Sequence, residues 1–271
     1  MHQRLSVSGL CYFDLPFPAL IEELERLGVG TTTLMAGQLK DFGLDRAQEL
    51  LASSGITVAG LIGHLPQNLG DPQTWDDTRA DLIWDLDAAA QLGAPALYTV
   101  TGSLLDGDED ASFDTFARFI EPVAAHAGEV GVHFAIEPTL PAYAYVSFTH
   151  TLESTLRLAR QCNMGICLDV YHVWNDPDLS RTLREFIDHV ALVQIGDSGV
   201  DENGTTQKQI PGEGDVPMTD LIGQIIDAGY QGAFDLEIDG PLIEAVGTAT
   251  AIERSVAYLD RTLSAASATS R

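Results

Sequence analysis

Basic residues are scarce in this sequence. Only 14 of the 271 residues are Lys or Arg, against 40 Asp or Glu, so the formal net charge is −26, and the only lysines are Lys40 and Lys208. A surface with this charge repels phosphate backbones. The composition therefore argues against a nucleic-acid partner, and we interpret the acidity as a solvated surface and not as a binding feature.

Long hydrophobic runs and paired cysteines are also missing. No apolar stretch approaches the roughly 18 residues that a transmembrane helix needs, and residues 1–10 lack the apolar core of a signal peptide. The three cysteines, Cys11, Cys162 and Cys167, have no C-x-x-C spacing, which indicates reduced thiols in the core. We therefore expect a soluble cytoplasmic protein without a membrane partner.

The pattern of the chain is a strict alternation of apolar strand-like runs with longer amphipathic segments. The expected strands are LSVSGL, TTTLM, TVAGLIG, ALYTV, VHFAI, GICLDV, ALVQIG and GAFDLEI. The expected helices lie near residues 17–28, 44–54, 73–92, 112–130, 150–161, 179–188, 218–228 and 244–264. Eight such units in about 250 residues favour a closed parallel barrel. The sequence predicts one α/β domain over residues 1–271, a single (β/α)8 TIM barrel, with a frayed tail over about 264–271.

Four oxygen-bearing residues stand at the ends of four expected strands: Glu137, Asp169, Gln194 and Glu237. The carboxyl ends of barrel strands meet at one rim, so these side chains could build a divalent-metal site whose carboxylates also move protons. Taken singly, each has another interpretation: a loop glutamate, a helix N-cap at Asp169, a satisfied core amide at Gln194, and surface acidity at Glu237. As a set they predict an enzyme.

The segments IEP, LDVYHVW, VQIGDS, PGEGDVP and FDLEI resemble the xylose isomerase-like barrel superfamily across nearly the whole chain. This sugar (phosphate) isomerase and epimerase group includes ketose 3-epimerases, hydroxypyruvate isomerase, inosose isomerases and dehydratases, and the endonuclease IV nucleases. Its epimerase-like members hold one metal with Glu, Asp, His and Glu from four strands. The resemblance implies Glu137, Asp169 and Glu237 as ligands of one divalent cation, Mn²⁺ before Mg²⁺ or Co²⁺. Gln194 stands where many relatives have His. Sequences that resemble hydroxypyruvate isomerase also have glutamine at this position.

The activity that the resemblance implies is isomerisation or epimerisation through an enediolate, with Glu137 and Glu237 as the acid and base. His172, His64, Lys208 and Trp174 would bind the substrate, an unphosphorylated keto sugar or polyol ketone. Lys208 precedes the glycine-rich PGEG segment, which could equally be a turn, and both histidines could be loop residues. A metal-dependent lyase, either like inosose dehydratase or eliminating from 3-keto glycosides, is one alternative. A non-catalytic sugar-binding or partner subunit is the other. Relatives often form dimers or tetramers, which allows a homo-oligomer.

Overall fold

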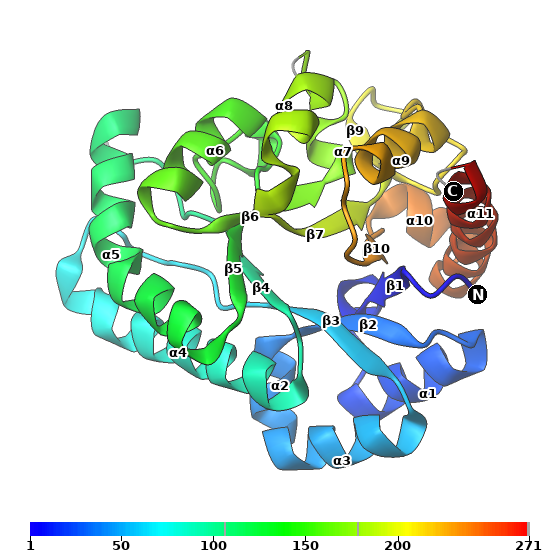
Figure 1. The fold of residues 1–271 in the computed structure, drawn as a ribbon, viewed down its shortest axis with the longest axis horizontal. Helices are drawn as coiled ribbons and strands as arrows, with labels where there is room; N and C mark the ends of the chain where they lie inside the picture. Colours follow the sequence, from blue (N-terminus) through cyan, green and yellow to red (C-terminus); the bar gives the residue numbers. More distant parts are fainter. Residues whose placement is uncertain (106, 178, 270–271) are drawn as a thin grey trace.

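The barrel is closed and parallel. The computed structural model describes residues 1–105, 107–177 and 179–269. Within these residues eight strands pair side by side in the order β1-β10-β7-β6-β5-β4-β3-β2, and helices surround them (Figure 1). The barrel strands are β1 (Leu5–Ser8), β2 (Thr31–Met35), β3 (Thr57–Ile62), β4 (Ala96–Thr99), β5 (His133–Ile136), β6 (Gly165–Asp169), β7 (Val190–Ile195) and β10 (Phe234–Leu236). The predicted (β/α)8 barrel is confirmed.

The helices follow the strands as the periodicity predicts. The long ones are α1 (Phe17–Leu27), α3 (Leu44–Ser54), α4 (Trp75–Leu92), α5 (Glu109–Val130), α6 (Leu152–Gln161), α8 (Leu179–Phe186), α9 (Met218–Asp227) and α11 (Thr248–Thr269). Shorter helices are α2 (Ala36–Phe42), α7 (Val170–Val173) and α10 (Pro241–Val246), with 3-10 turns η1 (Gly9–Tyr12), η2 (Pro72–Thr74), η3 (Pro141–Tyr143) and η4 (Ile187–His189). Gly55 and Gly93 end α3 and α4 with φ of 72° and 69°, a conformation that glycine adopts without steric cost.

The connection between β7 and α9 differs from the expected alternation. It contains an antiparallel hairpin of β8 (Asp197–Val200) and β9 (Thr206–Gln209), which the sequence pattern did not predict. Helix α11 continues to Thr269, so most of the segment expected to fray belongs to this helix, and residues 270–271 lie outside the described part. The N-terminus lies beside α11, with the Met1 ammonium 3.9 Å from Asp260 (Figure 1).

The hydrophobic core has two layers. A large cluster fills the space between strands and helices, and a small one, formed by Tyr98, Ala135, Cys167 and Leu192, fills the barrel itself. All three cysteines are free and buried, as predicted. Within the described residues, none of the helices has both the length and the apolar character required to cross a membrane. The polar groups at one end of the inner layer form the site described next.

Candidate active site

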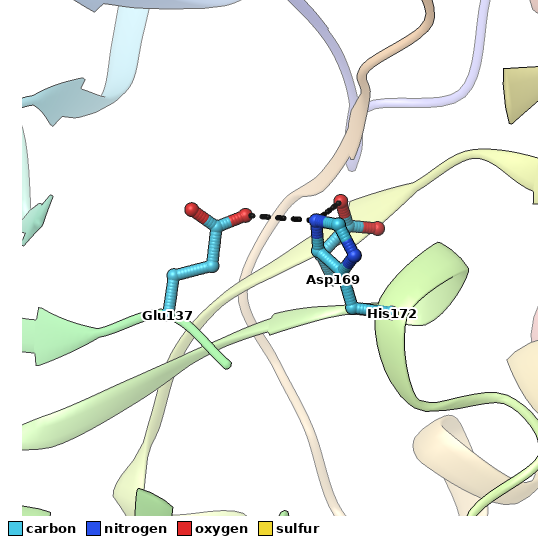
Figure 2. Close-up of side chains that lie close together, drawn as sticks. All are labelled: Glu137, Asp169 and His172. Atoms are coloured by element: carbon cyan, nitrogen blue, oxygen red, sulfur yellow. Dashed lines mark ion pairs between the residues drawn. The ribbon is translucent and has the colours of Figure 1, made fainter. Parts of the chain in front are cut away.

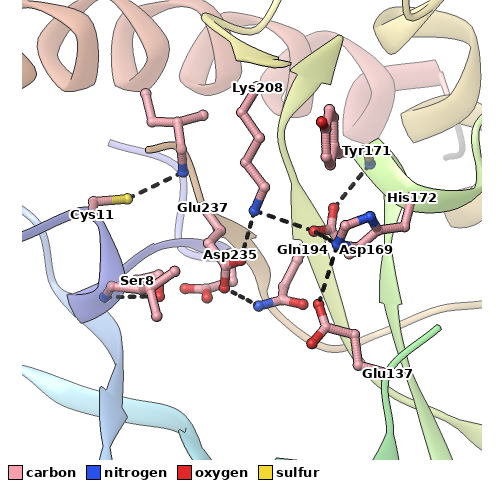
Figure 3. A network of polar contacts seen from close by, with 12 residues as sticks. Ser8, Cys11, Glu137, Asp169, Tyr171, His172, Gln194, Lys208, Asp235 and Glu237 are labelled. Atoms are coloured by element: carbon pink, nitrogen blue, oxygen red, sulfur yellow. Dashed lines mark hydrogen bonds and ion pairs between the residues drawn. The ribbon is translucent and has the colours of Figure 1, made fainter. Parts of the chain in front are cut away.

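The four residues at the expected strand ends converge in the structure. Glu137 directly follows β5, Asp169 ends β6, Gln194 lies on β7 and Glu237 directly follows β10. These strands are consecutive neighbours in the barrel, so their carboxyl ends bring the four side chains together (Figure 3). All four are buried. The sequence therefore located this cluster correctly, and the roles of its members depend on their contacts.

Asp169 has one oxygen that is used and one that is not. Its Oδ1 accepts a hydrogen bond from the Tyr171 backbone N–H at 2.9 Å and caps α7, so the N-cap interpretation is confirmed. Its Oδ2 is buried and accepts no hydrogen bond from the described residues, although the Lys208 ammonium lies 3.3 Å away and His172 Nε2 lies 3.5 Å away. A buried carboxylate oxygen without a hydrogen bond is costly unless it serves a ligand. This oxygen therefore points to a cation site.

His172 faces both Asp169 and Glu137 (Figure 2). Its Nδ1 accepts a hydrogen bond from the Leu140 backbone N–H at 3.2 Å, so the proton of the neutral ring is on Nε2. Burial lowers the pKa of His172 to about 4, so the ring is neutral at pH 7. Nε2 lies 3.9 Å from Glu137 Oε1 and can donate to a carboxylate or a substrate oxygen. A protonated Nε2 has no lone pair for a metal, which favours a substrate-binding role.

Lys208 projects from β9 into the same cluster (Figure 3). Its Nζ lies 2.7 Å from Glu237 Oε1 and 3.3 Å from Asp169 Oδ2, and the residue is only 6% exposed. Burial alone would lower the pKa of Lys208, but the Asp169 and Glu237 carboxylates outweigh it and hold that pKa well above its usual value. The ammonium is therefore charged. The hairpin that the sequence pattern missed is the element that delivers it.

Gln194 lies beneath the carboxylates, pointing into the barrel as strand alternation predicted. Its Nε2 donates to the Tyr98 hydroxyl at 2.7 Å and to Glu237 Oε2, and its Oε1 accepts from the Cys167 thiol at 2.9 Å. The amide is therefore satisfied by protein groups, as the core-amide interpretation expected. Metal ligation by its oxygen would require the amide to turn over.

The two glutamates have raised pKa values. Burial is the largest cause for Glu137, and the Glu237 and Asp169 carboxylates add to it, so the pKa of Glu137 is well above its usual value. Burial also raises the pKa of Glu237, while Lys208 opposes part of that rise. A raised pKa makes a carboxylate a stronger base. Both groups therefore hold a proton more tightly than an exposed carboxylate does, which suits them to take and return protons.

The donor set fits a divalent cation. Ligand atoms of Glu137, Asp169 and His172 lie within 4.8 Å of one another. Glu237 lies next to this group, because the Lys208 ammonium contacts both Glu237 and Asp169. Carboxylate oxygens are ligands for Mg²⁺ and Mn²⁺. Glu137, Asp169 and His172 are therefore residues that could hold a metal ion, and the Nε2 proton of His172 favours the two carboxylates within this group.

Asp197 is a residue whose role the sequence interpretation missed. It is fully buried after β7, and its carboxylate accepts four backbone hydrogen bonds, from Ser198, Gly212, Gly214 and Val216, at 2.8 to 3.1 Å. A Cβ at Gly214 would lie 2.3 Å from the Ser198 carbonyl oxygen, so glycine is required there. The glycine-rich turn interpretation is thus confirmed, and Asp197 holds that turn against the hairpin that carries Lys208. The signal was an acid directly after a strand, followed by the PGEG segment.

His64 lies just after β3, and Asp85 orients it. Asp85, fully buried on α4, accepts from the His64 backbone N–H at 2.7 Å and lies 2.8 Å from its Nδ1. His64 lines a cavity of about 500 Å³ beside the ends of β1, β2 and β3, together with Phe13 and Gln67. Asp85 carried no sequence signal, because an acid on a helix is usually a surface residue. Trp174 is half-buried after α7 and packs against the large core cluster.

Three named proteins are similar to this chain. It is 27% identical over 211 residues to a Streptomyces coelicolor protein assigned as a hydroxypyruvate isomerase, covering 72% of this chain and 73% of that protein. It is 24% identical over 257 residues to the D-psicose 3-epimerase of Ruminiclostridium cellulolyticum, covering 87% and 82%. It is 26% identical over 173 residues to the 3-dehydroshikimate dehydratase of Pseudomonas putida, covering 59% of this chain and 25% of that protein.

A family model described as a xylose isomerase-like TIM barrel matches residues 21–262. The match spans all the strands from β2 to β10 and every candidate site residue. The chain therefore belongs to the xylose isomerase-like TIM barrel family.

Proposed function

We propose that the protein is a divalent-metal-dependent isomerase or epimerase that moves a proton on a keto sugar or related polyol ketone through an enediolate. The observation that carries this proposal is the buried set of three carboxylates, Glu137, Asp169 and Glu237, in which Asp169 Oδ2 accepts no hydrogen bond and faces the Lys208 ammonium. The similarity to a hydroxypyruvate isomerase and a D-psicose 3-epimerase supports the same reaction class.

The carboxylates of Glu137, Asp169 and Glu237 would hold the cation, with Gln194 as a fourth ligand if its amide turns. Three charged oxygen ligands and no imidazole favour Mn²⁺ or Mg²⁺, and Co²⁺ less so. When bound, the cation supplies Lewis-acid polarisation of a carbonyl. The protein's own groups do the rest.

Glu137 and Glu237 are the proton-transfer pair. Two strands, β6 and β7, separate β5 from β10 in the barrel, so the two glutamates approach a substrate from different sides of the mouth. One carboxylate removes the proton next to the carbonyl, and the other returns a proton to the adjacent carbon or to the opposite face. Because both side chains are buried, water cannot solvate the carboxylates and so make them weaker bases.

Four further residues would bind the substrate. His172 donates from Nε2 to a hydroxyl or carbonyl oxygen, and His64, held by Asp85, lines the cavity on the β3 side. Lys208 offers the one ammonium of the cluster, and Trp174 would support the wall beside α7. A single buried ammonium, already paired with carboxylates, suits a neutral sugar better than a phosphate ester.

The test is proton exchange followed by NMR. Chelator-stripped protein, loaded with Mn²⁺, would be incubated in D2O with hydroxypyruvate, ketohexoses, inososes and 3-keto glycosides, and the metal removed before spectra are recorded. Metal-dependent deuterium uptake at the carbon next to the carbonyl, with an isomer or epimer as product, is the expected result. A chelated sample is the control. No exchange on the whole panel, together with no bound metal, would contradict the proposal and favour a sugar-binding subunit.

Elimination is the second candidate, and the similarity to a 3-dehydroshikimate dehydratase favours it. The same carboxylate would remove the same proton, and a hydroxyl or glycosidic oxygen on the next carbon would then leave. The product distinguishes the two reactions, because elimination gives a new vinyl proton signal and isomerisation does not.

A further inference from the structure

Lys208 contacts the two carboxylates that the proposed metal site requires. Its Nζ is 2.7 Å from Glu237 Oε1 and 3.3 Å from the Asp169 Oδ2 that accepts no hydrogen bond (Figure 3). A divalent ion binds carboxylate oxygens at about 2.0–2.6 Å. It would therefore need the position between these oxygens that the ammonium holds.

We propose that Lys208 and a divalent cation compete for the carboxylates of Asp169 and Glu237, so that metal binding displaces the ammonium and Lys208 sets the metal affinity of the site. This inference rests on the proposed function only in that the carboxylates bind metal.

The ammonium is a built part of the cluster. Lys208 is 6% exposed, and its Nζ also lies 5.6 Å from the centre of the Tyr171 ring. Of the two lysines in the chain, the other, Lys40, pairs with Asp81 on the surface, at 2.6 Å. Neighbouring carboxylates repel one another, and Lys208 offsets that repulsion. The same pairing lowers the affinity for any second cation.

The side chain can leave this position while the backbone stays in place. Lys208 extends from β9, which pairs with β8 in the hairpin, and Asp197 fastens the following turn to that hairpin. The flexible four-carbon stem lets Nζ move by several ångströms through rotation alone. An ammonium displaced from the carboxylates then becomes available to a substrate oxygen beside the metal.

The first test is calorimetric titration of Mn²⁺ into chelator-stripped protein. We compare wild type with Lys208→Met, which keeps the length of the side chain and removes its charge, and with Lys208→Arg, which keeps the charge. Lys40→Met is the matched control. We expect Lys208→Met to bind Mn²⁺ about tenfold tighter or more, because a like charge at this range shifts an ionic equilibrium by that order. Lys208→Arg and Lys40→Met should stay near wild type. A Lys208→Met protein that binds no tighter than wild type overturns the proposal.

The second test needs no variant and so does not depend on the stability of Lys208→Met. Protein labelled with ¹³C at lysine Cε gives signals from the two lysines. Titration with Mg²⁺, which is diamagnetic, should shift the Lys208 signal in step with the calorimetric binding curve and leave the Lys40 signal unchanged. Mg²⁺ binding that leaves Lys208 unmoved overturns the displacement.

These tests separate the inference from the proposed function. If wild type and Lys208→Met bind Mn²⁺ equally and metal-dependent proton exchange is observed, the competition by Lys208 is refuted and the proposed enzyme activity is retained. Absence of Mn²⁺ binding in both proteins would remove the metal site itself, and the inference with it.

Discussion

Replacing Asp197 with alanine should destabilise the protein strongly, although Asp197 touches none of the carboxylates. Its two oxygens accept from four backbone N–H groups, those of Ser198, Gly212, Gly214 and Val216. The bonds from Ser198 and Val216 are fully buried, and the two from the glycines are partly buried. Alanine leaves all four donors without this acceptor.

The magnitude follows from the burial of these donors. An unpaired buried donor costs about 1–3 kcal/mol, and a partly buried one that regains water costs less, about 0.5–1 kcal/mol. The total is about 3–8 kcal/mol, and we expect about 4 kcal/mol because the turn can relax. A domain's stability is typically about 5–15 kcal/mol. At roughly 2–4 °C per kcal/mol, the expected fall in Tm is about 8–16 °C.

The assay is thermal unfolding of Asp197→Ala against wild type, followed by circular dichroism. Asp201→Ala is the matched control, because Asp201 also accepts backbone N–H groups on this hairpin, from Asn203 and Thr205, but through solvent-exposed hydrogen bonds. Water replaces an exposed acceptor, so its Tm should change by no more than about 2 °C. A Tm for Asp197→Ala within 3 °C of wild type, on the order of 1 kcal/mol, would refute the reasoning.

Three other predictions concern the site. Glu237→Gln should keep the fold, because an amide oxygen can still accept a hydrogen bond from Lys208. It should lower the rate of proton exchange, measured by deuterium uptake, by about 10²–10⁴-fold. Near-normal exchange would rule out Glu237 as an acid or base. Asp85→Asn should lower kcat/KM about tenfold or more with little change in Tm, because an amide cannot hold the His64 tautomer as the carboxylate does. Unchanged steady-state kinetics would show that His64 takes no part in the reaction. Gln194→His should tighten the binding of Zn²⁺ and Co²⁺ relative to Mg²⁺, because it adds an imidazole beside Glu237. If calorimetry shows the same metal preference as wild type, residue 194 on β7 is not a metal ligand.

The sequence predicted the barrel and the place of the carboxylates for the same reason. Parallel strands in a closed barrel all end at one rim, so a residue's position at the end of its strand is enough to place it there. Glu137, Asp169 and Glu237 could therefore be found from local pattern alone, and strand alternation was enough to turn Gln194 inward.

The hairpin of β8 and β9 could not be predicted in the same way. Its strands contain residues such as Asp197, Gly199 and Gln207, which lack the apolar alternation of a barrel strand. What stabilises the region is a buried carboxylate binding the backbone of residues up to 19 positions away in the chain. The periodicity of a sequence depends on neighbouring residues and does not predict such a long-range contact.

The fold and the groups available at the barrel mouth follow from the periodicity of the sequence and from the order of its strands. How those groups are used depends on contacts that form only when the chain is folded. The Leu140 N–H sets the tautomer of His172, Cys167 and Tyr98 orient the amide of Gln194, and Lys208 lies between Asp169 and Glu237. Each of these is a contact between different segments of the chain, and packing in three dimensions sets its geometry and its energy.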